Sequence, residues 1–314
     1  MASEHFAVID TMDNDTQDSG QLDLFRHSRA VTLTNDAIAA LLARNSAHAE
    51  ASVDRLRAEE PGYHTLDALS RLCRALGEWP PSTANVVEIA RAIHQLEAEV
   101  QPSAAASMGG HAVDFMRPLW RDLAQAARAH EYDKAFPQSH CAALYLRCGD
   151  AKAAAGAAAS VPNSDNNADA LQWLAVSHYR MDGLDACRPI LARLALVAPG
   201  RLKCTLAEIA DVTLNQNWRA FETTCTWLDP DDENTGSWFP AWYLLEYQGA
   251  RIVPVELITL PATRPAQALI TIARLLELEK RGHSAVLISA RSRLRELGSD
   301  IFALYMARRT VNHR

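Results

Sequence analysis

His140 and Cys141 are adjacent in this sequence, and with Cys148 they form its closest approach to a reactive cluster. An imidazole next to a thiol can serve as base and nucleophile, and such side chains together can also bind zinc. These side chains fall on alternating positions of a predicted helix, however, where the same residue types are ordinary packing residues. We therefore expect them to fill space rather than to carry out chemistry.

An acidic segment made of Asp229, Asp231, Asp232 and Glu233 is the nearest approach to a cation site. A calcium loop needs a glycine at its sharp bend, and Asn234 occupies that position. The sequence also lacks a glycine-rich phosphate loop, a G-x-S-x-G elbow, an HExxH motif and a paired-cysteine zinc pattern. It therefore predicts a protein that is not an enzyme and that holds neither a metal nor a cofactor.

The elements that carry these residues are predicted to be helices. Alanine and leucine supply most of the apolar positions, and alternating runs of β-branched residues are nearly absent. With 48% hydrophobic and 22% charged residues in 314 positions, the chain can bury a large core. We expect an all-α fold with little or no sheet.

A turn residue recurs in the middle of the chain. Gly149, Gly183 and Asn217 are 34 residues apart, and Tyr145 and Tyr179 precede the first two by four positions. A period of this length is typical of stacked helical hairpins, because a single hairpin cannot bury its apolar face alone. The sequence therefore predicts repeated hairpins whose turns fall at these three residues.

Residues 137–230 resemble the tetratricopeptide repeat family in period, turn and tyrosine. Proline also follows each expected second helix, at Pro162, Pro199 and Pro230. The match is degenerate, because the family's early tryptophan and its glycine at the close helix contact are both missing. The positions concerned are Gln138, Gln172 and Leu206 for the tryptophan, and Ala142, Val176 and Ala210 for the glycine.

This resemblance implies a right-handed superhelical stack of hairpins, an α-solenoid, whose concave surface binds a protein or peptide. Tyr145 and Tyr179 would lie on successive first helices and are candidate groove residues. The alternative is that both tyrosines pack between repeats.

Composition divides the chain into four regions. Residues 1–30 are predicted to be a disordered acidic tail, and residues 31–100 to form N-terminal helical hairpins. The tetratricopeptide-like repeats are expected at 111–230 and a C-terminal helical cap at 231–314. Between the first hairpins and the repeats, Pro102 and Gly109-Gly110 favour a flexible connection.

The expected tail contains one short motif, formed by Gln21, Leu22, Asp23, Leu24 and Phe25. It resembles the QL[S/D]LF peptide by which bacterial replication and repair proteins dock on the sliding clamp of DNA polymerase. That resemblance implies an accessible, extended peptide whose glutamine enters a polar pocket and whose leucine and phenylalanine enter an apolar one. Alternatively, its apolar side chains attach the tail to the first hairpin.

Aromatic residues gather between residues 218 and 247. Helical spacing places Trp238 with Trp242 and Phe239 with Tyr243, so these side chains could anchor a partner. Packing between the repeats and the C-terminal cap would explain the same spacing.

Charge is distributed unevenly along the chain, whose net charge is −7. Residues 1–25 hold acidic side chains and no lysine or arginine, which argues against a secretory signal peptide and favours a cytoplasmic protein. No apolar run is long enough for a membrane span. Five arginines near the C-terminus could contact nucleic acid or form a solvated face. They are Arg291, Arg293, Arg295, Arg308 and Arg309.

The leading hypothesis from the sequence is a cytoplasmic, bacterial-type adaptor or scaffold that binds a partner protein or peptide on a helical-repeat surface. The second is an accessory factor of DNA replication, repair or genome defence, recruited by the sliding clamp through residues 21–25.

Overall fold

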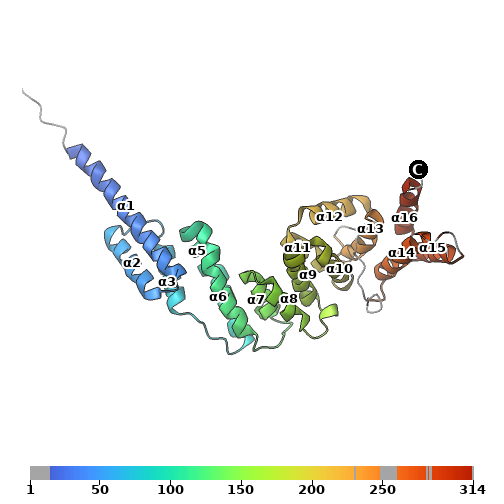
Figure 1. The fold of residues 1–314 in the computed structure, drawn as a ribbon, viewed down its shortest axis with the longest axis horizontal. Coiled ribbons are helices and arrows are strands. Elements are labelled where there is room, and N and C mark those ends of the chain that lie inside the picture. The colour runs from blue at the N-terminus through green and yellow to red at the C-terminus, as the bar shows by residue number, and fades with distance from the viewer. Residues whose placement is uncertain (1–14, 230, 248–259, 281, 283–284, 313–314) are drawn as a thin grey trace, which may run out of the picture. The chain divides into compact units, whose positions relative to one another are not determined.

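The computed structural model describes residues 15–229, 231–247, 260–280, 282 and 285–312, with side chains for residues 29–309 of these ranges. All regular structure in these ranges is helical, and no strand occurs in them (Figure 1). The prediction of an all-α fold is confirmed. The chain forms two compact units, Met1–Leu123 and Ala124–Arg314, so residues 111–123, expected to begin the repeats, belong to the first unit.

The first unit is built of helices. They are α1 (Asp15–Leu42), α2 (Ser46–Glu59), α3 (Leu66–Gly77), α4 (Val86–Gln95), α5 (Gln101–Met108) and most of α6 (Ala112–Ala127). Of these, α4 and α5 are joined without a break by the π-helical turn Leu96–Val100. The prediction of a flexible connection at 101–110 is wrong, because these residues form α5 and a short 3-10 turn. Pro102 comes just after the π-helical turn Leu96–Val100, where the regular α-helical hydrogen-bond pattern is already interrupted.

Helix α1 begins at Asp15, so the prediction of a disordered tail over residues 1–30 is wrong for residues 15–30. Residues 1–14 lie outside the described residues. Arg29 pairs with Glu59 at 2.8 Å, which sets the end of α2 level with Arg29. Residues 15–28 continue α1 beyond that level (Figure 1). At 1.5 Å per residue, this extension is roughly 21 Å of helix.

The core of the first unit is aliphatic, with Leu41, Leu56, Leu69 and Ile89 fully buried. Asp122 adds a polar link, because its carboxylate accepts the indole N–H of Trp79 at 2.9 Å and pairs with Arg44 at 2.8 Å. These contacts attach α6 to the segments that follow α1 and α3.

In the second unit, consecutive helices pack against each other. They are α7 (Cys141–Cys148), α8 (Ala151–Ala159), α9 (Ala168–Asp182), α10 (Leu184–Val197), α11 (Pro199–Ile209), α12 (Val212–Thr224), α13 (Phe239–Glu246), α14 (Arg264–Lys280), α15 (Ala285–Leu297) and α16 (Ser299–Asn312). Over the part of the chain that the structure describes, no helix is both long and apolar enough to cross a membrane.

Two of the three predicted turns are found. Gly149 and Gly183 end α7 and α9 at φ values of 82° and 79°, which glycine adopts without strain. The third is wrong, since Asn217 lies inside α12 and is buried. The turn falls instead at Ala210, because Asp211 caps α12 by accepting the N–H of Leu214 at 2.8 Å.

The first helices of the hairpins are linked by polar contacts. Tyr179 donates its hydroxyl to Asp211 at 2.9 Å, and the Gln172 amide donates to Glu208 at the same distance. The guanidinium of Arg180 donates to the carbonyl of Leu146 at 2.7 Å. These contacts connect α9 with α7 on one side and with α11 and α12 on the other.

The aromatic cluster is mainly core. Trp242 is 1% exposed and packs against Phe221 and Phe239, with ring centroids 5.6 and 5.8 Å away. The expectation that Trp242 anchors a partner is therefore wrong, and packing between α12 and α13 explains its position. Trp238 is half-buried, and its ring lies against the backbone at Gly298.

Most of the C-terminal arginines are paired within the second unit. Glu279 binds Arg291 at 3.3 Å and Arg309 at 2.8 Å, and it also accepts the hydroxyl of Tyr305. Arg308 pairs with Glu246, and Arg293 pairs with Glu296 at 3.2 Å. These carboxylates neutralise much of the positive charge that the sequence places near the C-terminus.

We predict that Glu279→Gln lowers the free energy of unfolding by about 1–3 kcal/mol, because it removes the charge shared by two arginines. Urea unfolding followed by circular dichroism measures this change. The matched control is Glu277→Gln, which removes an exposed pair with Lys280 and should change stability by less than about 0.5 kcal/mol. Equal losses in the two variants would contradict a central role for Glu279.

Candidate functional site

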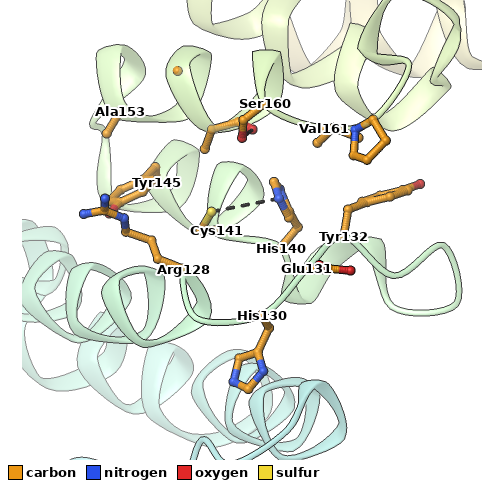
Figure 2. Close-up of a pocket in the computed structure, with 13 residues that line it drawn as sticks. Arg128, His130, Glu131, Tyr132, His140, Cys141, Tyr145, Ala153, Ser160 and Val161 are labelled. Carbon is orange, nitrogen blue, oxygen red and sulfur yellow. Dashed lines mark hydrogen bonds between the residues drawn. The ribbon is translucent and has the colours of Figure 1, made fainter.

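The second unit contains an open hollow of about 750 Å³ beside α7 and α8, which we call the α7–α8 hollow. Its size is typical of sites that bind small molecules or short peptide segments. Its walls come from the loop before α7, from α7, and from α8 with the residues that follow it (Figure 2). The lining residues are Arg128, His130, Glu131, Tyr132, His140, Cys141, Tyr145, Ala153, Gly156, Ala157, Ser160, Val161 and Pro162.

The hollow exists because α8 has almost no side chains of any size on this face. Ala153, Gly156, Ala157 and Ser160 follow the i, i+3, i+4, i+7 spacing of one helix face. A Cβ added at Gly156 would meet nothing within 4 Å. Alanine stabilises the helix by propensity, and Asp150 caps it by accepting the Ala153 N–H at 3.0 Å. A well-formed helix therefore leaves open space.

His140 forms the inner wall and is only 8% exposed. Its Nδ1 accepts the N–H of Ala142 at 3.3 Å, so the side chain caps α7, and its ring stacks on Trp173 with centroids 5.0 Å apart. Burial lowers the pKa of His140, which favours the neutral ring. Since Nδ1 accepts a hydrogen bond, the ring proton is on Nε2.

Cys141 lies next to this proton, with its sulfur 4.0 Å from His140 Nε2 (Figure 2). Burial raises the pKa of the Cys141 thiol, and the nearby Arg128 opposes that shift. A reactive cysteine needs a lowered pKa and a base that can take its proton, whereas the pKa of this thiol is raised, the His140 nitrogen that faces it carries the ring proton, and the other nitrogen accepts the Ala142 N–H. The pair is suited to contact a bound group rather than to attack it.

The loop wall is held by a polar chain. Tyr132 donates its hydroxyl to Asp169 at 2.7 Å, and Asp169 pairs with Arg201 at 3.1 Å. Asp169 is itself 7% exposed, so its charge is compensated inside the protein. This chain fixes the loop to α9 and α11, and the shape of the hollow is therefore set before anything binds.

Arg128 supplies positive charge to the hollow. Its side chain is exposed and lies beside Tyr145 (Figure 2), and its guanidinium forms no hydrogen bond or ion pair with any described residue. Glu131 lies on the other side of His140, next to Tyr132 (Figure 2). The two charges therefore lie on opposite sides of the His140 ring.

The two tyrosines predicted to share a groove on the repeat surface lie in different surroundings. Tyr145 is 8% exposed and lines the α7–α8 hollow, whereas Tyr179 is half-buried and bonded to Asp211. A smaller cavity of about 280 Å³ does lie along the first helices, but neither tyrosine lines it. The two tyrosines therefore do not form one site.

Other predicted site residues do not line the hollow. Residues 21–25 belong to the extension of α1, and their side chains are outside the described ones. In the acidic loop, Asp229 and Asp232 accept backbone N–H groups of their own turn at 2.9 Å. No group of three potential metal ligands occurs within the residues that the structure covers.

Sequence reasoning did not identify Arg128, Gly156 or Ala157 as site residues. The available signal was the run of small residues at 153–160, since a helix without large side chains cannot fill the space beside it. The position of Arg128 next to this run depends on the path of the loop, which no local pattern encodes.

Comparison of the chain with protein-family models, with curated proteins and with solved structures found no match.

We predict that Cys204 is the only one of the six cysteines that iodoacetamide alkylates rapidly in the folded protein at about pH 8, because it alone is exposed. Burial raises the pKa to about 11 for Cys73 and Cys187 and to about 12 for Cys225, so their thiolates form only at higher pH. Peptide mass spectrometry locates the label, and Cys204→Ser should abolish the fast phase. Rapid alkylation of Cys141 would contradict the neutral state inferred for it.

Proposed function

We propose that this chain is a non-catalytic adaptor that binds a segment of a partner protein on its helical-repeat unit, in the α7–α8 hollow. The observation that carries this proposal is an open hollow whose floor is made of small side chains and whose rim holds a cation without an internal partner. Small residues admit the side chains of a partner, and an unpaired guanidinium offers directional hydrogen bonds.

Preorganisation supports the proposal. His140 is fixed by its cap to α7 and by its stack on Trp173, and Tyr132 is fixed through Asp169. Walls that are already ordered lose little conformational entropy on binding, so more of the contact energy appears as affinity. The neutral state of His140 and Cys141 favours binding over catalysis.

We further propose that α7–α10 stack as tetratricopeptide-like hairpins in a right-handed superhelix, and that the protein acts in the cytoplasm of a bacterium. The turns at Gly149 and Gly183, 34 residues apart, support the repeat.

We predict that Ala157→Arg abolishes partner binding, because its long side chain occupies the hollow that Ala157 lines. The full chain is immobilised, partners are captured from a bacterial lysate, and captured proteins are quantified by mass spectrometry. The control Ala159→Arg makes the same change on an exposed position of the same helix and should capture as the wild type does. Both variants should keep the wild-type circular dichroism, and equal capture by both would exclude the hollow as the site.

A second candidate function is recruitment by the sliding clamp, and the extension of α1 favours it. Residues 21–25 lie beyond the level at which Arg29 meets Glu59, so the body of the first hairpin does not enclose this part of the backbone. Gly20 precedes the motif and lowers helix stability by roughly 0.5–1 kcal/mol relative to alanine. Local unwinding to the extended form that the motif resemblance implies is thereby easier.

We predict that the full chain binds purified bacterial sliding clamp with about micromolar affinity, equivalent to roughly −8 kcal/mol. Replacing Leu24 and Phe25 by Ala should abolish binding, as measured by calorimetry, and should leave the melting temperature nearly unchanged. If the two side chains instead pack on the first hairpin, the same change should destabilise the protein by several kcal/mol. Loss of stability together with no clamp binding by the wild type would eliminate this function.

A further inference from the structure

We propose that the α7–α8 hollow recognises an acidic side chain within the partner segment, together with a small or medium apolar side chain next to it. This inference rests on the proposed adaptor function and specifies the chemistry of the bound segment. Three features of the hollow support it: the unpaired Arg128, the buried proton on His140 Nε2, and the apolar floor of α8.

Arg128 sets the sign of the charge that the hollow accepts. Its guanidinium has no counterion among the described residues, although most of the C-terminal arginines in the same unit are paired with carboxylates. It also lines the hollow, next to Tyr145 (Figure 2). A carboxylate is the group that matches a guanidinium in charge and in hydrogen-bond geometry.

His140 supplies a second donor. The side chain is more than nine-tenths buried, and its Nε2 has the sulfur of Cys141 at 4.0 Å as its partner, at the outer limit for a contact with sulfur. A buried donor with so weak a partner is poorly satisfied, and an oxygen acceptor placed in the hollow would satisfy it. Arg128 and His140 lie on either side of Cys141 (Figure 2), so both donors border the space above this thiol that an acidic side chain would enter.

The charge balance favours a carboxylate over a phosphate group. The hollow offers one cation and one neutral imidazole, which suit a single negative charge. Glu131 lines the same hollow on the other side of His140 and repels any negative charge, so a singly charged group held at Arg128 is favoured over a doubly charged phosphate. The carboxylate of Asp169 is already paired with Arg201 and hydrogen-bonded to Tyr132, so it adds no free charge.

The floor of the hollow selects the neighbouring side chain. Ala153, Gly156 and Ala157 present methyl groups and bare backbone, and Val161 and Pro162 extend this apolar surface. The open space above Gly156 can accept an aliphatic side chain of the size of valine or leucine. An aliphatic residue adjacent to the acidic one therefore fills space that α8 leaves empty.

The test uses the full chain, labelled with nitrogen-15, and a set of capped pentapeptides. Each peptide has a central Glu with Ala, Val, Leu or Met beside it, and each has a partner peptide with Gln in place of Glu. Shifts of the amide signals of Ala153, Gly156 and Ala157 report binding. We expect at least one Glu peptide to bind at least tenfold more tightly than its Gln partner, and Arg128→Gln to remove that preference.

Filling the hollow provides an independent variant. Gly156→Leu should abolish binding of the Glu peptides while keeping or raising the melting temperature, because leucine favours the helix and its Cβ meets no neighbour. The control Ala159→Leu adds the same side chain at an exposed position and should bind as the wild type does. Loss of binding without loss of stability distinguishes a blocked site from a damaged fold.

Several results would overturn the inference: no binding of any Glu peptide at millimolar concentration, equal binding of Glu and Gln peptides, or unchanged binding in Gly156→Leu. A peptide ending in a free carboxylate that binds more tightly than every internal Glu peptide would show that the hollow reads a chain terminus instead. If Ala157→Arg loses its captured partners while Glu and Gln peptides bind equally, the adaptor function stands and the acidic specificity fails. If Ala157→Arg keeps its partners, the adaptor site itself is wrong.

Discussion

The structure of the second unit depends on how α8 packs between α7 and α9. Ala154 and Ala158 are fully buried at this contact, and their small side chains allow the helices to approach closely. The same composition leaves the adjacent face of α8 without side chains that could cover α7 or the preceding loop. Close packing on one face and open space on the next therefore have a single cause.

His140 connects this packing to the candidate site. One imidazole caps α7, stacks on Trp173 of the next hairpin and presents its remaining proton to the hollow. A residue that had only to cap the helix could be serine or aspartate, which are better caps than histidine. The aromatic ring adds the contact with α9, so the site and the join between hairpins share one side chain.

The sequence predicted the features that depend on local chemistry. Helical class followed from composition, and the turns at Gly149 and Gly183 followed from residues that adopt positive φ. The prediction of a turn at Asn217 was wrong because Asp211 caps α12 earlier in the chain. That prediction relied on the 34-residue period and did not consider the capping residue. The burial of Trp242 and the position of Arg128 depend on which helices meet, and that information is not local.

The paired arginines at the C-terminal end affect how a partner approaches. Glu246, Glu279 and Glu296 neutralise these arginines. The arginines therefore form no strong positive region that could offset the net charge of −7. An acidic segment would then approach against a repulsive field before reaching Arg128, and salt screens that field over about 8 Å at physiological ionic strength. Added salt should thus accelerate the encounter while weakening the final ion pair, leaving the affinity nearly insensitive to ionic strength.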